Sequence, residues 1–150
     1  MFVLDNSNVM EKIMIHLEHV NLVVNDIPKM LEFYQAAFPH WRVREKGQGE
    51  WHGKPRTWLH FGDQYHYIAL SDNGEGSNRD LAGHQVGLAH FAYVTHNVDS
   101  ITERLTRAGF RIANPGTKEP HRKNVYFVDP AGFEVEFVEY LSDDPSLRNA

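Results

Sequence analysis

The sequence predicts an α+β fold built from two similar modules, each with the element order β-α-β-β-β. Strand-like and helix-like segments follow this order over residues 15–72 and again over residues 85–140. The stretch between them, residues 73–84 (NGEGSNRDLAGH), has the Gly, Asn and Ser content of a linker. The segments EHVNLVV and AHFAYVT, which open the two modules, align so that His19 and His90 take the same position. Such an internal repeat is typical of two like modules that share one core or one sheet.

The first module begins with a strand at 15–24, IHLEHVNLVV, which is rich in β-branched and apolar residues. Asn25 and Asp26 are suitable helix caps, Pro28 suits a first turn, and apolar residues then follow at helical spacing up to Phe38. Pro39 ends this helix. Strands are expected at 41–47, 57–62 and 65–72, with a loop over 47–56.

The second module repeats the pattern, with a strand at 88–95 and a helix capped by Asn97 or Asp99 and closed by Gly109. Strands at 110–114, 124–128 and 133–140 complete it. Residues 1–14 are interpreted as an N-terminal extension and residues 141–150 as a C-terminal tail, so that the chain forms one domain overall.

Composition narrows the classes of function. The 150 residues include no cysteine, which excludes a disulfide framework, a thiolate nucleophile and any Cys-ligated metal site. The net charge of −5 argues against nucleic acid and anionic membranes as partners. No apolar run is long enough to span a bilayer, and the start lacks signal-peptide features, so a cytoplasmic protein with a small-molecule partner is expected.

Strand alternation places a set of chemically similar side chains on one face. His19 and Asn21 point away from the predicted helix of their module, and His90 does so in the second. In the last strand Glu136 also lies on the face opposite the apolar, helix-facing residues. Two imidazoles and a carboxylate are costly to bury unless a divalent metal pairs with them, and three ligands leave the open coordination position that catalysis needs.

Other residues are weaker candidates with an ordinary structural alternative. The segment Lys118 to Asn124, KEPHRKN, carries basic groups that could hold a carboxylate or phosphate, or could be a solvated turn. His60 or His66 could supply a fourth ligand or a proton relay. Arg56, Trp58 and Tyr67 could line the cavity or simply pack in the core. Glu134 is an additional carboxylate near the predicted metal, with a solvent-exposed strand end as the alternative.

Three segments carry a resemblance to a known family: HVNLVVNDIPKMLEFY, AHFAYVTHNVDSI and NVYFVDPAGFEVEFVE. Through them, residues 15–140 resemble the vicinal oxygen chelate superfamily, which includes glyoxalase I, the fosfomycin-resistance thiol transferases, extradiol dioxygenases and bleomycin-binding proteins. The resemblance implies paired βαβββ modules that form a partly closed barrel around a cavity. It also implies a homodimer, since modules in this superfamily are often exchanged or packed across a dimer.

The resemblance further implies one divalent metal ion, Ni, Zn, Mn, Co or Fe, held by His19, His90 and Glu136. Glu136 and Tyr126 are then the expected catalytic residues. Ala69 stands where glyoxalase I has a fourth ligand, which is a departure from that enzyme, and Asn21 replaces a threonine of the fosfomycin-resistance group. The residues expected around the substrate are Asn21, Arg56, Tyr67, Ala69, His121, Arg122 and Lys123.

The function implied first is a glyoxalase-like lyase or isomerase, in which the metal chelates vicinal oxygens of a small substrate and stabilises an enediolate. Thiol transfer of the fosfomycin-resistance kind ranks second and extradiol-type dioxygenation third. A non-catalytic small-molecule binding or resistance protein ranks fourth.

Overall fold

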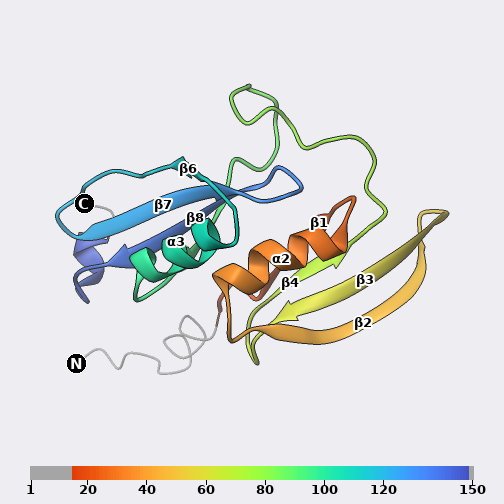
Figure 1. Cartoon of the computed structure of the whole chain (residues 1–150), viewed down its shortest axis with the longest axis horizontal. Helices are drawn as coiled ribbons and strands as arrows, with labels where there is room; N and C mark the ends of the chain where they lie inside the picture. Colours follow the sequence, from red (N-terminus) through yellow and green to blue (C-terminus); the bar gives the residue numbers. More distant parts are fainter. Residues whose placement is uncertain (1–14, 149–150) are drawn as a thin grey trace, which may run out of the picture.

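A computed structural model describes residues 15–148 and shows two four-stranded sheets with two helices (Figure 1). Each sheet mixes one parallel pair with two antiparallel pairs. The first sheet has the order β1 (His19–Val23), β4 (Tyr67–Ser71), β3 (Lys54–Gly62), β2 (Arg42–Trp51), and the second has the order β5 (Phe91–Val94), β8 (Glu134–Tyr140), β7 (Arg122–Val128), β6 (Ile112–Asn114). With α2 (Ile27–Ala37) and α3 (Val98–Arg107), these elements confirm the predicted α+β fold of paired βαβββ modules. The predicted extension 1–14 lies outside the described residues, and the described part of the tail holds one turn of 3-10 helix, η1 (Pro145–Leu147).

Both helices begin at side-chain caps. The carboxylate of Asp26 accepts a hydrogen bond from the backbone N–H of Lys29 at 3.0 Å, and Pro28 lies in the first turn of α2. For α3 the structure selects Asn97 over Asp99 as the cap, because the Asn97 amide oxygen accepts from Ser100 N at 2.9 Å.

The helices lie side by side between the two sheets, as Figure 1 shows. The helix-facing sides of both sheets and the inner sides of both helices form one apolar core. Arg104 of α3 joins the modules by donating to the carbonyl oxygens of Ala36 and Ala37, both at 3.0 Å. Each sheet therefore turns its other side, which we call its outward face, away from the shared core.

One chain does not close the two sheets into the predicted partly closed barrel. The physical reason is that the apolar side of each sheet is already used in the shared core between the modules. β1, which begins at His19, and β5, which begins just after His90, are edge strands. Each of them pairs with another strand on one side only.

The predicted loop at 47–56 is wrong. β2 and β3 continue as a long antiparallel hairpin through this stretch, joined by a tight turn at His52 and Gly53, both with positive φ. Two positive φ angles in a two-residue loop match the twist of the flanking strands. Gly47 lets the Trp58 ring lie against β2, because a Cβ at position 47 would stand 2.8 Å from that ring.

Two other boundaries differ from expectation and affect the site. β1 begins at His19 rather than at residue 15, so His19 stands at the exposed start of its strand. β7 begins at Arg122, so Arg122 and Lys123 belong to a strand rather than to a loop.

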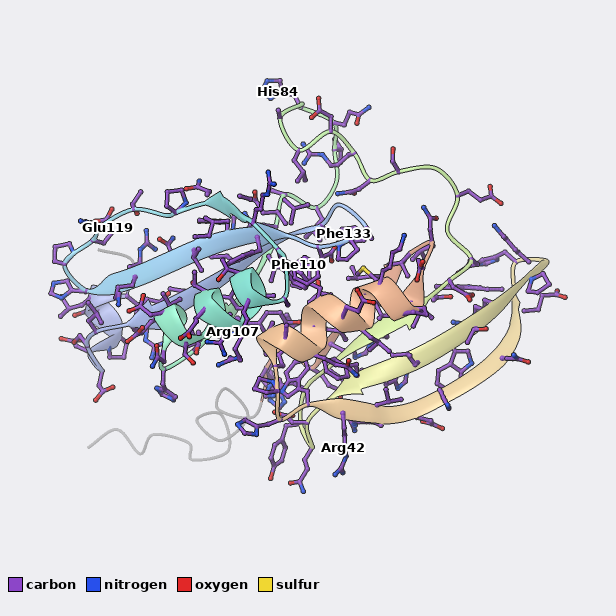
Figure 2. The ribbon with its side chains drawn as sticks, viewed as in Figure 1. Arg42, His84, Arg107, Phe110, Glu119 and Phe133 are labelled. Carbon is purple, nitrogen blue, oxygen red and sulfur yellow. The ribbon has the colours of Figure 1, made fainter. Side chains whose placement is uncertain are left out.

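The connection between the modules, residues 72–90, is held by side chains. The Arg79 guanidinium donates to the carbonyl oxygens of Gln85 and Gly83, and Asn78 donates to Gly132 O at 2.8 Å. Figure 2 shows His84 at the tip of this connection, away from both sheets. Within residues 15–148, neither helix is long and apolar enough to cross a membrane.

Candidate functional site

The second sheet brings His90 and Glu136 together on its outward face. His90 lies one residue before β5, and Ala92 of β5 is the register partner of Glu136 on β8. The His90 Nε2 atom is 3.2 Å from Glu136 Oε2, and Glu134 Oε1 lies 3.8 Å from His90 Nδ1 on the other side of the ring. The imidazole thus stands between two carboxylates, one at each ring nitrogen.

Asn124 holds the Glu136 carboxylate in place. Its amide nitrogen donates to Glu136 Oε1 at 3.0 Å, and its amide oxygen accepts from Thr117 N at 3.1 Å. Gly116 permits this contact, because a Cβ there would lie 2.2 Å from the Asn124 amide oxygen. Asn124 is only 8% exposed, and both ends of its amide are hydrogen-bonded. Because Asn124 binds Oε1 of Glu136, the other carboxylate oxygen, Oε2, is the one that lies near His90.

Tyr126 of β7 is the register partner of Glu136 and packs edge-on against the His90 ring, with centroids 5.4 Å apart. Burial and the adjacent Glu136 carboxylate raise the pKa of the Tyr126 phenol. Tyr126 is therefore a neutral hydrogen-bond donor at pH 7.

The first sheet presents His19 on its own outward face. Glu18 Oε1 lies 2.9 Å from His19 Nδ1, and the pKa of Glu18 is lowered by this hydrogen bond. The His19 ring stacks on Tyr67, its register partner on β4, at 4.5 Å. His19 and His90 thus share one feature, a carboxylate near Nδ1, which is Glu18 at 2.9 Å for His19 and Glu134 at 3.8 Å for His90.

Further side chains extend this face across the sheet. Asn21, Ala69 and His60 form one cross-strand row beside His19, and Trp58 and Arg56 follow His60 along β3 at alternate positions. His60 packs against Tyr67 at 4.5 Å, and burial lowers its pKa, so its imidazole is neutral at pH 7. Ala69 is 4% exposed and offers no ligand. His66 lies in the β3–β4 turn, where its backbone N–H donates to the Asp63 carboxylate.

The basic segment divides between the two faces of the second sheet. Arg122 has the same strand parity as Asn124 and Tyr126 and so belongs to the outward face. Lys123 has the opposite parity and donates to Asp99 of α3 at 2.8 Å, which raises the pKa of Lys123. Lys123 therefore lies on the side of β7 that faces α3, opposite the face that carries Glu136. His121 lies just before β7, where its carbonyl accepts from Leu141 N.

The structure of one chain therefore brings His90, Glu136 and Tyr126 together and keeps His19 on the other sheet. Over residues 15–148, no three His, Asp or Glu side chains are grouped so that they could hold a metal ion. His19 instead borders a cavity of about 430 Å³ that runs between the edges of β1 and β5 and also reaches Ala92 and Val94.

Comparison with known families identifies the fold. The model of the glyoxalase/bleomycin resistance protein/dioxygenase superfamily matches residues 16–137. The chain belongs to this superfamily. The match covers both modules and confirms the resemblance that the three sequence segments carry.

Individual members of the superfamily resemble the chain over most of its length. A lactoylglutathione lyase of Neisseria meningitidis is 27% identical over 136 residues, which are 87% of this chain and 95% of that protein. The structure of a glyoxalase/bleomycin resistance protein/dioxygenase domain from Frankia sp. EAN1pec superposes with a TM-score of 0.70 at 20% identity, covering 91% of this chain and 99% of that one. A mutant fosfomycin resistance protein from Listeria monocytogenes, complexed with Mn(II) and dihydroxypropylphosphonic acid, has a TM-score of 0.62 at 20% identity, covering 91% and 100%.

Glu18 was not among the sequence candidates, and Asn124 was named only as the last residue of the basic segment. Asn124 shares the strand parity of Tyr126 and Glu136, so alternation could have placed it on the same face. Glu18 directly precedes His19, and adjacent strand residues usually point to opposite faces. It reaches the His19 ring because β1 begins only at residue 19, which the sequence pattern does not reveal.

Proposed function

We propose that the protein is a metal-dependent enzyme whose divalent ion is held by His90 and Glu136 of one copy and His19 of a second copy. The observation that carries the proposal is the 3.2 Å pair of His90 Nε2 and Glu136 Oε2 on an outward face. His19 occupies the repeat-equivalent place on the other outward face. Two copies related by a two-fold axis would bring the first sheet of each against the second sheet of the other, giving two equal sites.

The donor set fits a divalent metal. One imidazole nitrogen and one carboxylate oxygen lie at a distance that a shared cation would bridge, and both belong to the ligand types of Zn, Mn, Fe, Co and Ni. The groups next to the two histidines fit a metal site as well, because a metal-binding histidine ordinarily donates its other ring N–H to a carboxylate or a carbonyl. Glu134 stands there for His90 and Glu18 for His19.

The outward faces also carry the apolar surface that an interface needs. Val23 is 44% exposed and Val94 is 61% exposed, and both lie on these faces, four residues along the chain from His19 and His90. Apolar side chains left in water by one chain are covered at low cost by a second copy. A homodimer is therefore part of the proposal.

The chemistry follows from the residues around the pair. A divalent ion supplies a Lewis acid that polarises two adjacent oxygens of a small substrate. Glu136 Oε2, held toward the site while Asn124 binds Oε1, would be a metal ligand and, once released from the metal, would be the base for a proton on the carbon next to those oxygens. Tyr126, neutral at pH 7, donates a hydrogen bond to the oxygen on which negative charge develops. Ala69 leaves the side facing Glu136 without a competing ligand.

Proton abstraction of this kind favours a glyoxalase-like lyase or isomerase. The 27% identity to the Neisseria lactoylglutathione lyase over both modules supports this reaction class. A second candidate reaction is transfer of a thiol to an electrophilic substrate, as in the fosfomycin-resistance enzymes. The position of Tyr126 against His90 favours this reaction. Incubation of the metal-loaded protein with a hemithioacetal of glutathione, and separately with fosfomycin and a thiol, distinguishes the two by their products.

Metal titration tests the proposal directly. The metal-free protein is expected to bind about one nickel, manganese or zinc ion per chain and to gain thermal stability, because a ligand that binds only the folded state stabilises it. Calorimetry gives the stoichiometry, and the melting temperature gives the linkage. Absence of binding with all three ions would contradict a metal-dependent function.

Asn124→Ala is expected to weaken metal binding by about 10- to 100-fold while leaving the fold intact. The reason is that Glu136 loses the amide that directs Oε2 toward His90. Asn78→Ala is the matched control. Asn78 also donates to an acceptor far away in the sequence, Gly132 O, but it contacts neither His90 nor Glu136. Equal metal affinity in the two variants would show that Asn124 does not position the ligand.

A further inference from the structure

The cavity between β1 and β5 is formed by one chain, and of the proposed metal ligands only His19 borders it. Its volume of about 430 Å³ is that of a small-molecule pocket. Both strands are edge strands that line the cavity without pairing with each other. Ala92 and Val94 lie on its outward side, and Val20 lies on its helix-facing side, so the cavity passes between the two strands into the interior.

Aromatic side chains form the inner wall of the cavity. The Phe38 and Trp41 rings are stacked at 4.3 Å, and Tyr93 packs edge-on against them at 4.8 and 5.8 Å. Phe91 lies beside Tyr93, with ring centroids 5.8 Å apart. All four side chains are only half-buried, whereas Phe33 of the adjoining core is 0% exposed. The core therefore leaves part of this aromatic surface uncovered, and that part borders the cavity.

Carboxylates supply negative charge at the mouth of the cavity. Glu18 and Asp63 line it, whereas no lysine or arginine of residues 15–148 does. His19 and His66 also line it, and each has its Nδ1 atom toward one of the two carboxylates, at 2.9 and 3.9 Å. Arg44 of β2 lies over the ring of Tyr67 but is not part of the lining. These charges favour a positively charged ligand and disfavour an anion.

Asp63 is held in place with one oxygen available. Its Oδ1 atom accepts the backbone N–H groups of Tyr65 and His66 at 2.8 and 2.7 Å. Its Oδ2 atom accepts no hydrogen bond within the described part of the chain. Burial opposes the shift, but the two backbone hydrogen bonds lower the pKa of the Asp63 carboxyl overall, so this group is ionised at pH 7. A fixed, charged acceptor thus stands at the mouth of an aromatic cavity.

We propose that this cavity binds an organic cation, namely an ammonium group carried on an aromatic or aliphatic body. The body lies against the aromatic wall, where it replaces water, and the ammonium group donates to Asp63 Oδ2. The faces of the surrounding rings attract the positive charge as well. One chain supplies the whole site, so this proposal depends neither on the proposed metal nor on a dimer.

The test uses the full-length protein and three probes of nearly equal shape. Phenethylammonium, 2-phenylethanol and phenylacetate carry a positive charge, no charge and a negative charge on the same phenyl body. Calorimetry is expected to show that phenethylammonium binds about tenfold more tightly than 2-phenylethanol, because only the cation gains from the rings and from the carboxylate. Phenylacetate should bind most weakly of the three.

The three tryptophans report where the probe binds. Their indole N–H signals are followed by ¹⁵N-resolved NMR and assigned with single Trp→Phe variants. The Trp41 signal is expected to shift and to saturate with phenethylammonium. The other two signals are internal controls and should not move, because Trp51 stacks on Arg56 and Trp58 packs against His60, and neither ring lines the cavity.

Asp63→Asn is expected to weaken phenethylammonium binding about tenfold and to leave 2-phenylethanol binding unchanged. Asparagine keeps the oxygen that accepts from the turn, so an effect on the fold would weaken both probes alike. Asp80→Asn is the matched control. Asp80 also accepts a backbone N–H, from Ala82 at 3.0 Å, but it does not line the cavity, and its variant should bind both probes as the parent does.

Trp41→Leu separates the aromatic contribution from that of the carboxylate. Leucine keeps an apolar wall but removes the ring face, so the preference for phenethylammonium over 2-phenylethanol should fall while 2-phenylethanol still binds. Equal affinity of the parent protein for the three probes, or a Trp41 signal that phenethylammonium does not move, would overturn the proposal. An Asp63→Asn variant that keeps the full preference for the cation would overturn it as well.

Discussion

An equimolar mixture of the His19→Ala and Glu136→Gln variants is expected to bind about one metal ion for every four chains, because about half of the dimers are heterodimers with one intact site, although each variant alone binds metal weakly. In a heterodimer, one site combines both lesions and is lost. The other site combines His19 of the Glu136→Gln chain with His90 and Glu136 of the His19→Ala chain, and it is intact. One chain alone keeps His19 on a different sheet from the pair, so recovery requires a second copy.

The control is a mixture of His90→Ala with Glu136→Gln. These two lesions lie in the same half of the site, 3.2 Å apart on one sheet, so no exchange of chains produces an intact set. Calorimetry on mixtures that were unfolded and refolded together measures the stoichiometry. Recovery in neither mixture, with a monomer in sedimentation, would mean that His19 does not join the pair.

The local fold was predictable because its signals are local. Alternation along β1 and β8 placed His19 and Glu136 opposite the helix-facing residues. Each helix start had two candidate caps, and the structure selects Asp26 and Asn97. The two strands of the β2–β3 hairpin were predicted, but their continuation through residues 47–56 was missed because β2 is almost entirely exposed and carries polar residues and glycines on both faces. Such a strand has no apolar alternation to detect.

The relation between the two sheets could not be predicted from alternation. The pattern shows which side of each sheet is apolar, but two apolar sides can close a barrel around a cavity or meet across a pair of helices. The chain takes the second arrangement, which separates His19 from Glu136. Lys123 was expected around the substrate, but it has the same strand parity as the core residues Val125 and Phe127. A strand that begins at Arg122 would therefore have predicted that Lys123 faces α3.

Asp129→Ala is expected to lower the free energy of unfolding by about 3 kcal/mol, the largest effect we expect from a single polar residue. Asp129 is 4% exposed and accepts the Tyr34 hydroxyl at 2.7 Å, which links α2 to the β7–β8 turn. Its other oxygen accepts the backbone N–H groups of Ala131 and Phe133 at 2.9 and 3.0 Å. Alanine would leave all three donors buried or half-buried without an acceptor.

Tyr34→Phe removes one of these bonds and should cost about half as much, near 1.5 kcal/mol. Urea unfolding of both variants and of the double variant gives the coupling between the two side chains. The turn precedes β8, which carries Glu134 and Glu136, so Asp129→Ala should also weaken metal binding while Tyr34→Phe does not. If Asp129→Ala is no less stable than Tyr34→Phe, the hydrogen bonds from the backbone to Asp129 contribute nothing to the free energy of unfolding.

Asp129→Asn adds a test by pH. Burial raises the pKa of the Asp129 carboxyl above its ordinary value of 3.8, despite the hydrogen bonds that oppose the shift. The folded state therefore binds this proton more tightly than the unfolded state does. The resulting stabilisation is complete below pH 3.8 and is lost as the pH rises through the folded-state pKa. Asparagine does not titrate, so the stability advantage of the parent over Asp129→Asn should shrink as the pH rises from about 3 to 6. An advantage that grows over this range would mean that the charged, hydrogen-bonded form dominates and that burial does not set the pKa.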